Sequence, residues 1–169
     1  MIRLLVVTLI ILSAISCKAD SIELNKNGIG ELALGINKEK VLNELVLKVE
    51  KKIVYGEENF VEYHVAYKEN NLVLRFDSNE LYYVELKDLS LKTHIDIGIG
   101  DSLATLRDKC SNLSISSGHA EGGYFTGNCL DVMYFFSLDN LTSKELVSGE
   151  VGGNKENEVR ISRIYIISI

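Results

Sequence analysis

The stretch ELALGINKEKV, residues 31–41, contains the repeating unit of the fold. Two leucines alternate with other residues, as in a half-buried strand, and lead into Gly35. Two positions later, Asn37 offers a side-chain oxygen to the unpaired N–H groups at the start of a helix. Val41 then begins an apolar helical face. The stretch therefore predicts a strand, a glycine turn and a short helix.

The same pattern returns at residues 96–106, DIGIGDSLATL. A glycine, a capping residue and an apolar helix position follow in the same order: Gly100, Ser102 and Leu106. One helical turn later, Leu45 in the first copy matches Cys110 in the second. The chain is therefore expected to consist of two related halves in one compact domain, residues 20–90 and 91–169.

The residues after each helix alternate in the manner of antiparallel strands. The expected strands lie at residues 61–67, 72–76 and 81–86 in the first half, and at 124–125, 130–136 and 159–169 in the second. The last strand is apolar on both faces from Ile164 to Ile167, which predicts that this part is central in the sheet or covered on both faces. Residues 148–158 are expected to form a flexible loop. We expect an α+β fold of two αβββ-like repeats, with an antiparallel sheet and two short helices packed on one side.

A family resemblance rests on one short pattern, in which a leucine and a glycine are followed by a capping residue and a valine. The pattern occurs at Leu34–Val41 and returns in similar form at Ile99–Leu106. The pattern resembles the tandem-repeat fold of the β-lactamase inhibitory proteins and of small outer-membrane lipoproteins with related halves. As an architecture, the resemblance covers the mature chain. It implies a protein that binds and blocks another protein.

The N-terminus has the features of a secretory signal peptide. Residues 1–16 hold one positive charge, a short apolar run and an exit of small residues. Spanning a bilayer takes about 20 apolar residues, so the run is too short for a transmembrane helix. Cleavage before Cys17 would make Cys17 a lipidated N-terminus, whereas cleavage before Asp20 would leave a free chain. We therefore expect an exported protein, in the periplasm or as an outer-membrane lipoprotein.

The chain has three cysteines. Once Cys17 is lipidated or removed, Cys110 and Cys129 remain, and in an oxidising compartment we expect them to form a disulfide. The alternative is two buried free thiols. A Cys-x-x-Cys motif is lacking in the sequence, which argues against a redox enzyme.

The charge balance narrows the class of partner. There are 24 acidic and 18 basic residues, a net charge of -6. Nucleic-acid binding needs an excess of Lys and Arg to neutralise phosphates, so it is not expected. A protein partner, such as a basic hydrolase or a toxin, suits the negative net charge better. The alternative is that the acidic excess only keeps the chain soluble. Contact with a membrane is expected only through the lipid anchor.

The segment SSGHAEGGYF, residues 116–125, is the first candidate binding site because its glycines allow unusual backbone conformations. It also carries two aromatic residues, the kind enriched at binding hot spots. The expected partner-binding residues are Ser117, Gly118, His119, Glu121, Gly122, Gly123, Tyr124 and Phe125. The alternative is a glycine-rich hairpin connection without a partner.

Four tyrosines on neighbouring predicted strands suggest a second surface: Tyr63, Tyr67, Tyr82 and Tyr83. Because adjacent residues of a strand face opposite ways, either Tyr82 or Tyr83 should lie on the open face of the sheet. Such a face could dock a partner, or the tyrosines could simply complete the core with their hydroxyls in water.

Catalytic and metal-binding patterns are weak. His119 and Glu121 would give two ligands, whereas a catalytic zinc needs three protein ligands and a structural one four. There is no Gly-x-Ser-x-Gly motif. We expect no enzyme, no metal and no cofactor. The expected function is an exported, non-enzymatic binding protein of the periplasmic inhibitor or immunity type, which blocks a partner such as an envelope-degrading hydrolase. The alternative is an envelope assembly or structural lipoprotein.

Overall fold

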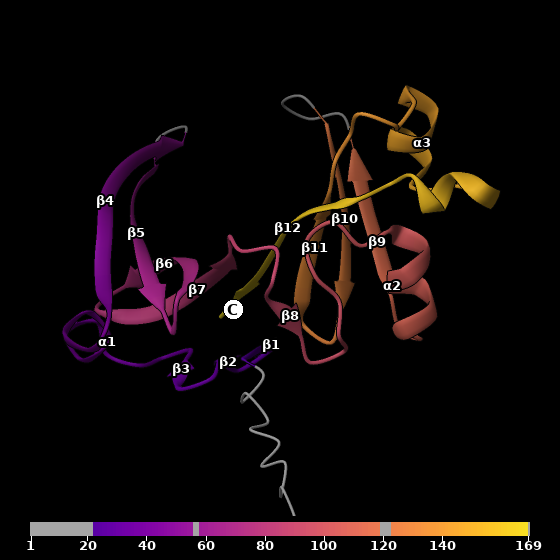
Figure 1. Cartoon of the computed structure of the whole chain (residues 1–169). Coiled ribbons are helices and arrows are strands. Elements are labelled where there is room, and N and C mark those ends of the chain that lie inside the picture. Colours follow the sequence, from indigo (N-terminus) through magenta and orange to yellow (C-terminus); the bar gives the residue numbers. More distant parts are fainter. Residues whose placement is uncertain (1–21, 56–57, 119–122, 169) are drawn as a thin grey trace, which may run out of the picture.

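The computed structural model describes residues 22–55, 58–118 and 123–168, and its centre is an eight-stranded antiparallel sheet (Figure 1). The strand order is β4-β5-β6-β7-β12-β11-β10-β9. The first half supplies β4 (Val46–Tyr55), β5 (Glu58–Tyr67), β6 (Asn70–Asp77) and β7 (Glu80–Leu86). The second supplies β9 (Ser114–Gly118), β10 (Tyr124–Cys129), β11 (Val132–Phe136) and β12 (Ile161–Ile167). The expected α+β class is confirmed, and β12 occupies the expected central position.

Each half contributes four strands to the large sheet, one strand more than expected. The two strands that the sequence did not predict are β4 and β9, which form the two edges of the sheet. Strand β4 contains three lysines and a register shift between Leu47 and Val49, which hides the alternation of polar and apolar residues. Strand β9 has the sequence SISSG, of low strand propensity, and is extended because it pairs with β10.

The two predicted helix starts are confirmed. Helix α1 (Lys38–Glu44) is capped by Asn37, whose side chain accepts a hydrogen bond from the backbone N–H of Glu39. Helix α2 (Leu103–Lys109) is capped by Ser102, which accepts one from Thr105. The glycine before each cap has a positive φ, 83° at Gly35 and 92° at Gly100, a conformation that favours glycine.

Each helix start is also bonded to the last strand of its own half. The N–H of Gly35 donates to the carbonyl of Leu81 (2.7 Å), and that of Gly100 donates to the carbonyl of Ile161 (2.8 Å). The same residues of β7 and β12 donate back, Leu81 to Ile36 and Ile161 to Asp101, each at 2.9 Å. The internal repeat is thus a repeat of backbone geometry.

A second, four-stranded sheet has the order β3-β2-β1-β8. Its strands are β1 (Glu23–Asn25), β2 (Gly28–Ile29), β3 (Leu32–Ala33) and β8 (Lys92–Thr93). Strand β8 lies beyond the expected boundary of residues 90 and 91, yet it pairs with β1 of the first half. In the second copy of the repeat, the expected strand at residues 96–99 is reduced to a bridge between Gly98 and Lys92.

The segment expected to be a flexible loop, residues 148–158, carries helical structure instead. Helix α3 (Ser143–Ser148) is followed by a 3-10 helix, η2 (Gly153–Asn157). A capping box of Thr142 and Glu145 starts α3, and ion pairs from Lys155 to Glu145 (2.6 Å) and from Arg107 to Glu156 (2.9 Å) hold the segment. In the described part of the chain, no helix has both the length and the apolar character needed to cross a membrane.

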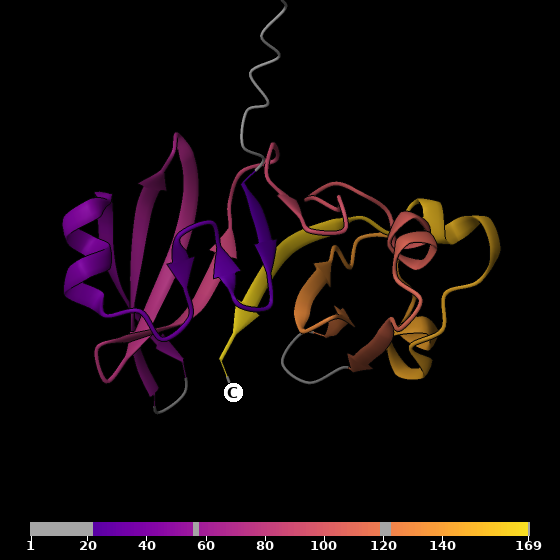
Figure 2. The same ribbon diagram turned by 90° about the horizontal axis from the view of Figure 1, so that it is seen from below.

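The large sheet curves, and the other elements lie outside the curve. In Figure 1, β4 and β5 rise on one side and β9 to β11 on the other, with β6, β7 and β12 between them. Helices α1 and α2 flank the outside, and Figure 2 shows the small sheet beneath the middle. The core lies on this outer side, where buried residues include Leu24, Val41, Leu74, Leu106, Tyr134 and Ile164. The inner, concave side has no helix over it among the described residues.

Candidate functional site on the open face of the sheet

The glycine-rich segment lies only partly within the described residues. His119, Glu121 and Gly122 fall outside them. Gly118 ends β9 and Tyr124 begins β10, where the two are register partners. A Cβ on Gly118 would come within 2.8 Å of Tyr124 Cε1, so this glycine leaves room for the tyrosine ring. Tyr124 is 37% exposed.

Three other residues of the segment have different surroundings. Ser117 lies against α3, since its Oγ would be 3.0 Å from a Cβ at Gly149. Gly123 has a φ of 88°. Phe125 is fully buried, with its ring 5.6 Å from that of Phe136. The expectation that Phe125 is a surface anchor is therefore wrong, because strand alternation turns it into the core when Tyr124 faces outward.

The expected disulfide between Cys110 and Cys129 is confirmed, with a Cα–Cα distance of 6.2 Å. It joins the C-cap of α2 to the last residue of β10. Tyr124 is the first residue of β10, so the bond holds the end of the hairpin opposite the glycine-rich segment. Bonds of this kind persist in oxidising compartments, which fits an exported protein. Cys17 lies outside the described residues.

A larger candidate surface is the concave side of the eight-stranded sheet, which we call the open face. Alternate residues of each strand point to it, and the register aligns them across the junction of the two halves: Tyr165 lies opposite both Glu85 and Met133. The residues at its centre are Glu62, Arg75, Tyr83, Glu85, Phe135, Arg163 and Tyr165.

Glu85 is a buried carboxylate at the middle of the open face, 1% exposed. It accepts hydrogen bonds from the Tyr83 hydroxyl (2.8 Å), Lys87 Nζ (2.6 Å) and Arg163 Nε (3.0 Å). Burial by itself raises the pKa of this carboxyl, but the Lys87 hydrogen bond and the Arg163 charge outweigh burial and hold the pKa below its ordinary value. Glu85 is therefore an ionised anchor for two cations.

Tyr83 links Glu85 to the neighbouring strand. Burial, followed by the nearby charge of Glu85, raises the pKa of its phenol, which stays protonated and donates to that carboxylate. The Arg75 guanidinium carbon lies 4.5 Å from the centre of the Tyr83 ring. Arg75 in turn donates from Nε (3.1 Å) and Nη2 (2.5 Å) to Glu62, which is 8% exposed.

His64 borders this pair. Its Nε2 is 3.4 Å from Glu62 Oε2, near enough for charge attraction if the ring is protonated. The same atom is buried and has no hydrogen-bond partner among the described residues.

Aromatic rings continue the face into the second half. Tyr165 lies between Tyr83 and Phe135, with ring-centre distances of 5.0 Å and 5.3 Å and interplanar angles of 35° and 33°. The Arg163 guanidinium carbon lies 5.3 Å from the centre of the Phe135 ring. A row of three aromatic rings, contacted by Arg75 at Tyr83 and by Arg163 at Phe135, thus crosses the middle of the sheet.

The sequence pointed to part of this surface. Tyr83 is the tyrosine that faces the open side, whereas Tyr63 and Tyr67 belong to the core. Glu85, Arg163 and Tyr165 were missed because their association depends on the pairing of β7 with β12, whose residues are far apart in the sequence.

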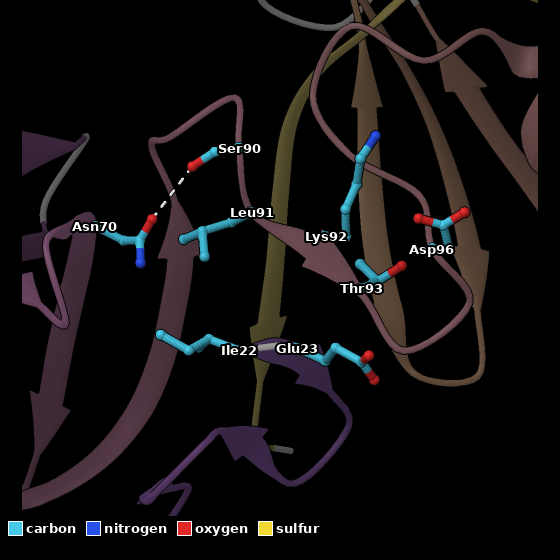
Figure 3. A pocket seen from close by; sticks show the side chains of 8 residues that line it. All are labelled: Ile22, Glu23, Asn70, Ser90, Leu91, Lys92, Thr93 and Asp96. Carbon is cyan, nitrogen blue, oxygen red and sulfur yellow. Dashed lines mark hydrogen bonds between the residues drawn. The ribbon is translucent and has the colours of Figure 1, made fainter. Parts of the chain in front are cut away.

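A hollow of about 290 Å³ near the described N-terminus is shown in Figure 3. It is lined by Ile22, Glu23, Asn70, Ser90, Leu91, Lys92, Thr93 and Asp96. Its charged groups pair with neighbours instead of converging: Lys92 with Asp101 (2.9 Å) and Asp96 with Lys109 (2.7 Å). Within residues 22–55, 58–118 and 123–168, no group of three or more His, Cys, Asp or Glu residues is arranged to hold a metal ion.

Comparison with known proteins shows a similar fold and no family. The chain resembles the crystal structure of the uncharacterized protein yfeY from Escherichia coli, with a TM-score of 0.55 and 12% sequence identity. The likeness covers 86% of this chain and 99% of that chain. No protein-family model and no curated protein matches the chain. At this identity, the likeness concerns the fold alone.

Proposed function

We propose that this chain is an exported, non-enzymatic protein that binds a protein partner on the open face, as a periplasmic inhibitor or immunity-type protein. The observation that carries the proposal is the arrangement of Arg75, Tyr83, Tyr165, Phe135 and Arg163 on a sheet face without a covering helix among the described residues. Tyrosine and arginine are enriched among the residues that dominate binding energies.

The buried carboxylate supports a binding role. Glu85 is only 1% exposed, and removing a carboxylate from water is costly. A sheet face that only met solvent would not require such a buried carboxylate. Here Glu85 fixes the side chains of Tyr83, Lys87 and Arg163 in one arrangement. Side chains fixed before binding lose less conformational entropy when a partner arrives. The face is organised in advance of contact.

Export is supported by the signal-like residues 1–16 and by the disulfide. The second candidate function, an envelope assembly or structural lipoprotein, rests on Cys17 following a small-residue exit. Mass spectrometry of the mature N-terminus separates the two: diacylglycerol on Cys17 favours the resident lipoprotein, and a chain that starts at Asp20 favours a free inhibitor.

The binding role is tested by photo-crosslinking in the organism that makes the protein. A photoreactive phenylalanine analogue replaces Phe135 on the open face or, as a control, Val147, which is 70% exposed on α3. We expect position 135 to give a discrete adduct with another protein and position 147 to give none. An adduct from position 147 alone would contradict the proposal.

A further inference from the structure

Resting on the proposed function, we propose that the partner presents an acidic protein surface, with a carboxylate that binds between Lys87 and Arg163 on the open face. The inference deepens the binding role by assigning the chemistry of the contact.

The middle of the open face, around Glu85, differs in charge from the chain as a whole. The whole chain has a net charge of -6. At the middle of the face, two cations surround one carboxylate: Lys87 and Arg163 both pair with Glu85. Overall charge favours a basic partner, but charge at the contact decides which groups can be buried there.

The positive excess is concentrated at Glu85. Its Oε1 accepts from both Lys87 Nζ (2.6 Å) and Arg163 Nε (3.0 Å), so one carboxylate is shared by two cations. The side chains of Lys87 and Arg163 are 41% and 46% exposed, which leaves part of each available to a ligand. A second carboxylate, brought by the partner, would balance the charge of the group.

The loss of water from Lys87 and Arg163 on binding favours a partner that brings a carboxylate. A neutral apolar partner that covered Lys87 and Arg163 would remove water from two cations. Only one negative charge, that of Glu85, would then balance them, which is unfavourable. A carboxylate restores acceptors for the ammonium and guanidinium N–H groups. The neighbouring rings of Phe135 and Tyr165 supply apolar contact around the ion pair.

A protein carboxylate suits the face better than a nucleic acid. Nucleic-acid affinity rises with the number of phosphates neutralised, and the proposed contact offers only Lys87 and Arg163 for that purpose. An acidic patch on a folded partner concentrates its charge on a small area and avoids the acidic remainder of this chain.

The test is an NMR titration of the isotope-labelled, disulfide-bonded mature protein with deca-glutamate, using deca-lysine and deca-thymidylate as comparisons. We expect deca-glutamate to shift the amide signals of residues 83–87 and 163–165. Lys87→Gln should weaken that binding, and Lys87→Gln combined with Arg163→Gln should weaken it about tenfold or more. Lys144→Gln, on exposed α3, is the matched control and should leave it unchanged.

The single Lys87→Gln variant keeps the test decisive if the double variant does not fold. Absence of shifts at these residues, equal shifts with deca-lysine, or tighter binding of deca-thymidylate would overturn the inference, the last in favour of a nucleic-acid site. If Phe135 crosslinks to a partner while deca-glutamate does not bind, the acidic contact fails and the binding role stands. If position 135 yields no adduct, the binding role itself fails.

Discussion

In the first half of the molecule, α1 and four strands follow one another with short connections, and β4 and β5 are each 10 residues long. In the second half, the equivalent β9 and β10 have only 5 and 6 residues, and the chain adds a disulfide, α3 and η2. Both halves keep the same hydrogen bonds between the helix start and the last strand. The repeated part is therefore the helix start with its strand, and the outer strands are free to vary.

The open face combines the two halves. The first contributes Glu62, Arg75, Tyr83 and Glu85, whereas the second contributes Phe135, Arg163 and Tyr165. The ion pair between Arg163 and Glu85 crosses the junction at 3.0 Å. The proposed binding surface is thus a property of the junction, and neither half carries it alone.

The largest expected effect is on the free energy of unfolding, and it should differ between the two aromatic residues that begin β10. Phe125→Ala removes a fully buried ring from the second-half core and should lower the free energy of unfolding by about 3–5 kcal/mol. Tyr124→Ala, at a position 37% exposed, should cost about 1 kcal/mol or less. Urea denaturation measures both, and equal losses would show that Phe125 is not a core residue.

The disulfide should stabilise the second half much more than the first. It closes a loop with a sequence separation of 19, so reduction should cost about 3 kcal/mol. Hydrogen exchange should then show greater loss of protection in α2 and β10 than in α1 and β5. Uniform loss across both halves would mean that the halves unfold as one unit and would remove this distinction.

The paired glycines test whether the repeat is one of backbone geometry. Gly35 and Gly100 have positive φ, and nothing lies within 4 Å of a Cβ built at either. Gly35→Ala and Gly100→Ala should each cost about 1–2 kcal/mol, through backbone strain alone. Denaturation of the two variants should give similar losses. A large loss in only one half would contradict the equivalence of the two turns.

The smallest expected effect is the pH dependence that Glu85 adds at the junction. Its folded-state pKa is lowered, so its stabilising contribution is present above the unfolded pKa, near 4.5, and is lost as the pH falls through the folded value. The stability difference between the wild type and Glu85→Gln should therefore shrink between pH 6 and pH 3. Denaturation curves across this range test it, and a constant difference would show that folding does not lower the pKa of Glu85.

Local signals in the sequence were sufficient for the parts of the fold that depend on neighbouring residues. Gly35, Asn37, Gly100 and Ser102 were identified because turns and caps are set by adjacent backbone groups. Strand β9 was missed because its serines become extended only through pairing with β10. Helix α3 had a usable signal, the capping box from Thr142 to Glu145.

The candidate site was harder to predict because it depends on long-range register. Alternation alone placed either Tyr82 or Tyr83 on the open face. Only the pairing of β7 with β12 brings Arg163 and Tyr165 beside Glu85. One sequence gives no indication of that register.

The most direct test of the account is the affinity of the crosslinked partner for Tyr165→Ala compared with Val147→Ala, with both variants first shown to be folded. Tyr165 lies at the centre of the aromatic row, whereas Val147 is exposed on α3. A hot-spot residue costs about 2 kcal/mol or more on truncation, so Tyr165→Ala should weaken binding by about 30-fold and Val147→Ala should leave it unchanged. Unchanged affinity of Tyr165→Ala would contradict the assignment of the open face as the binding surface.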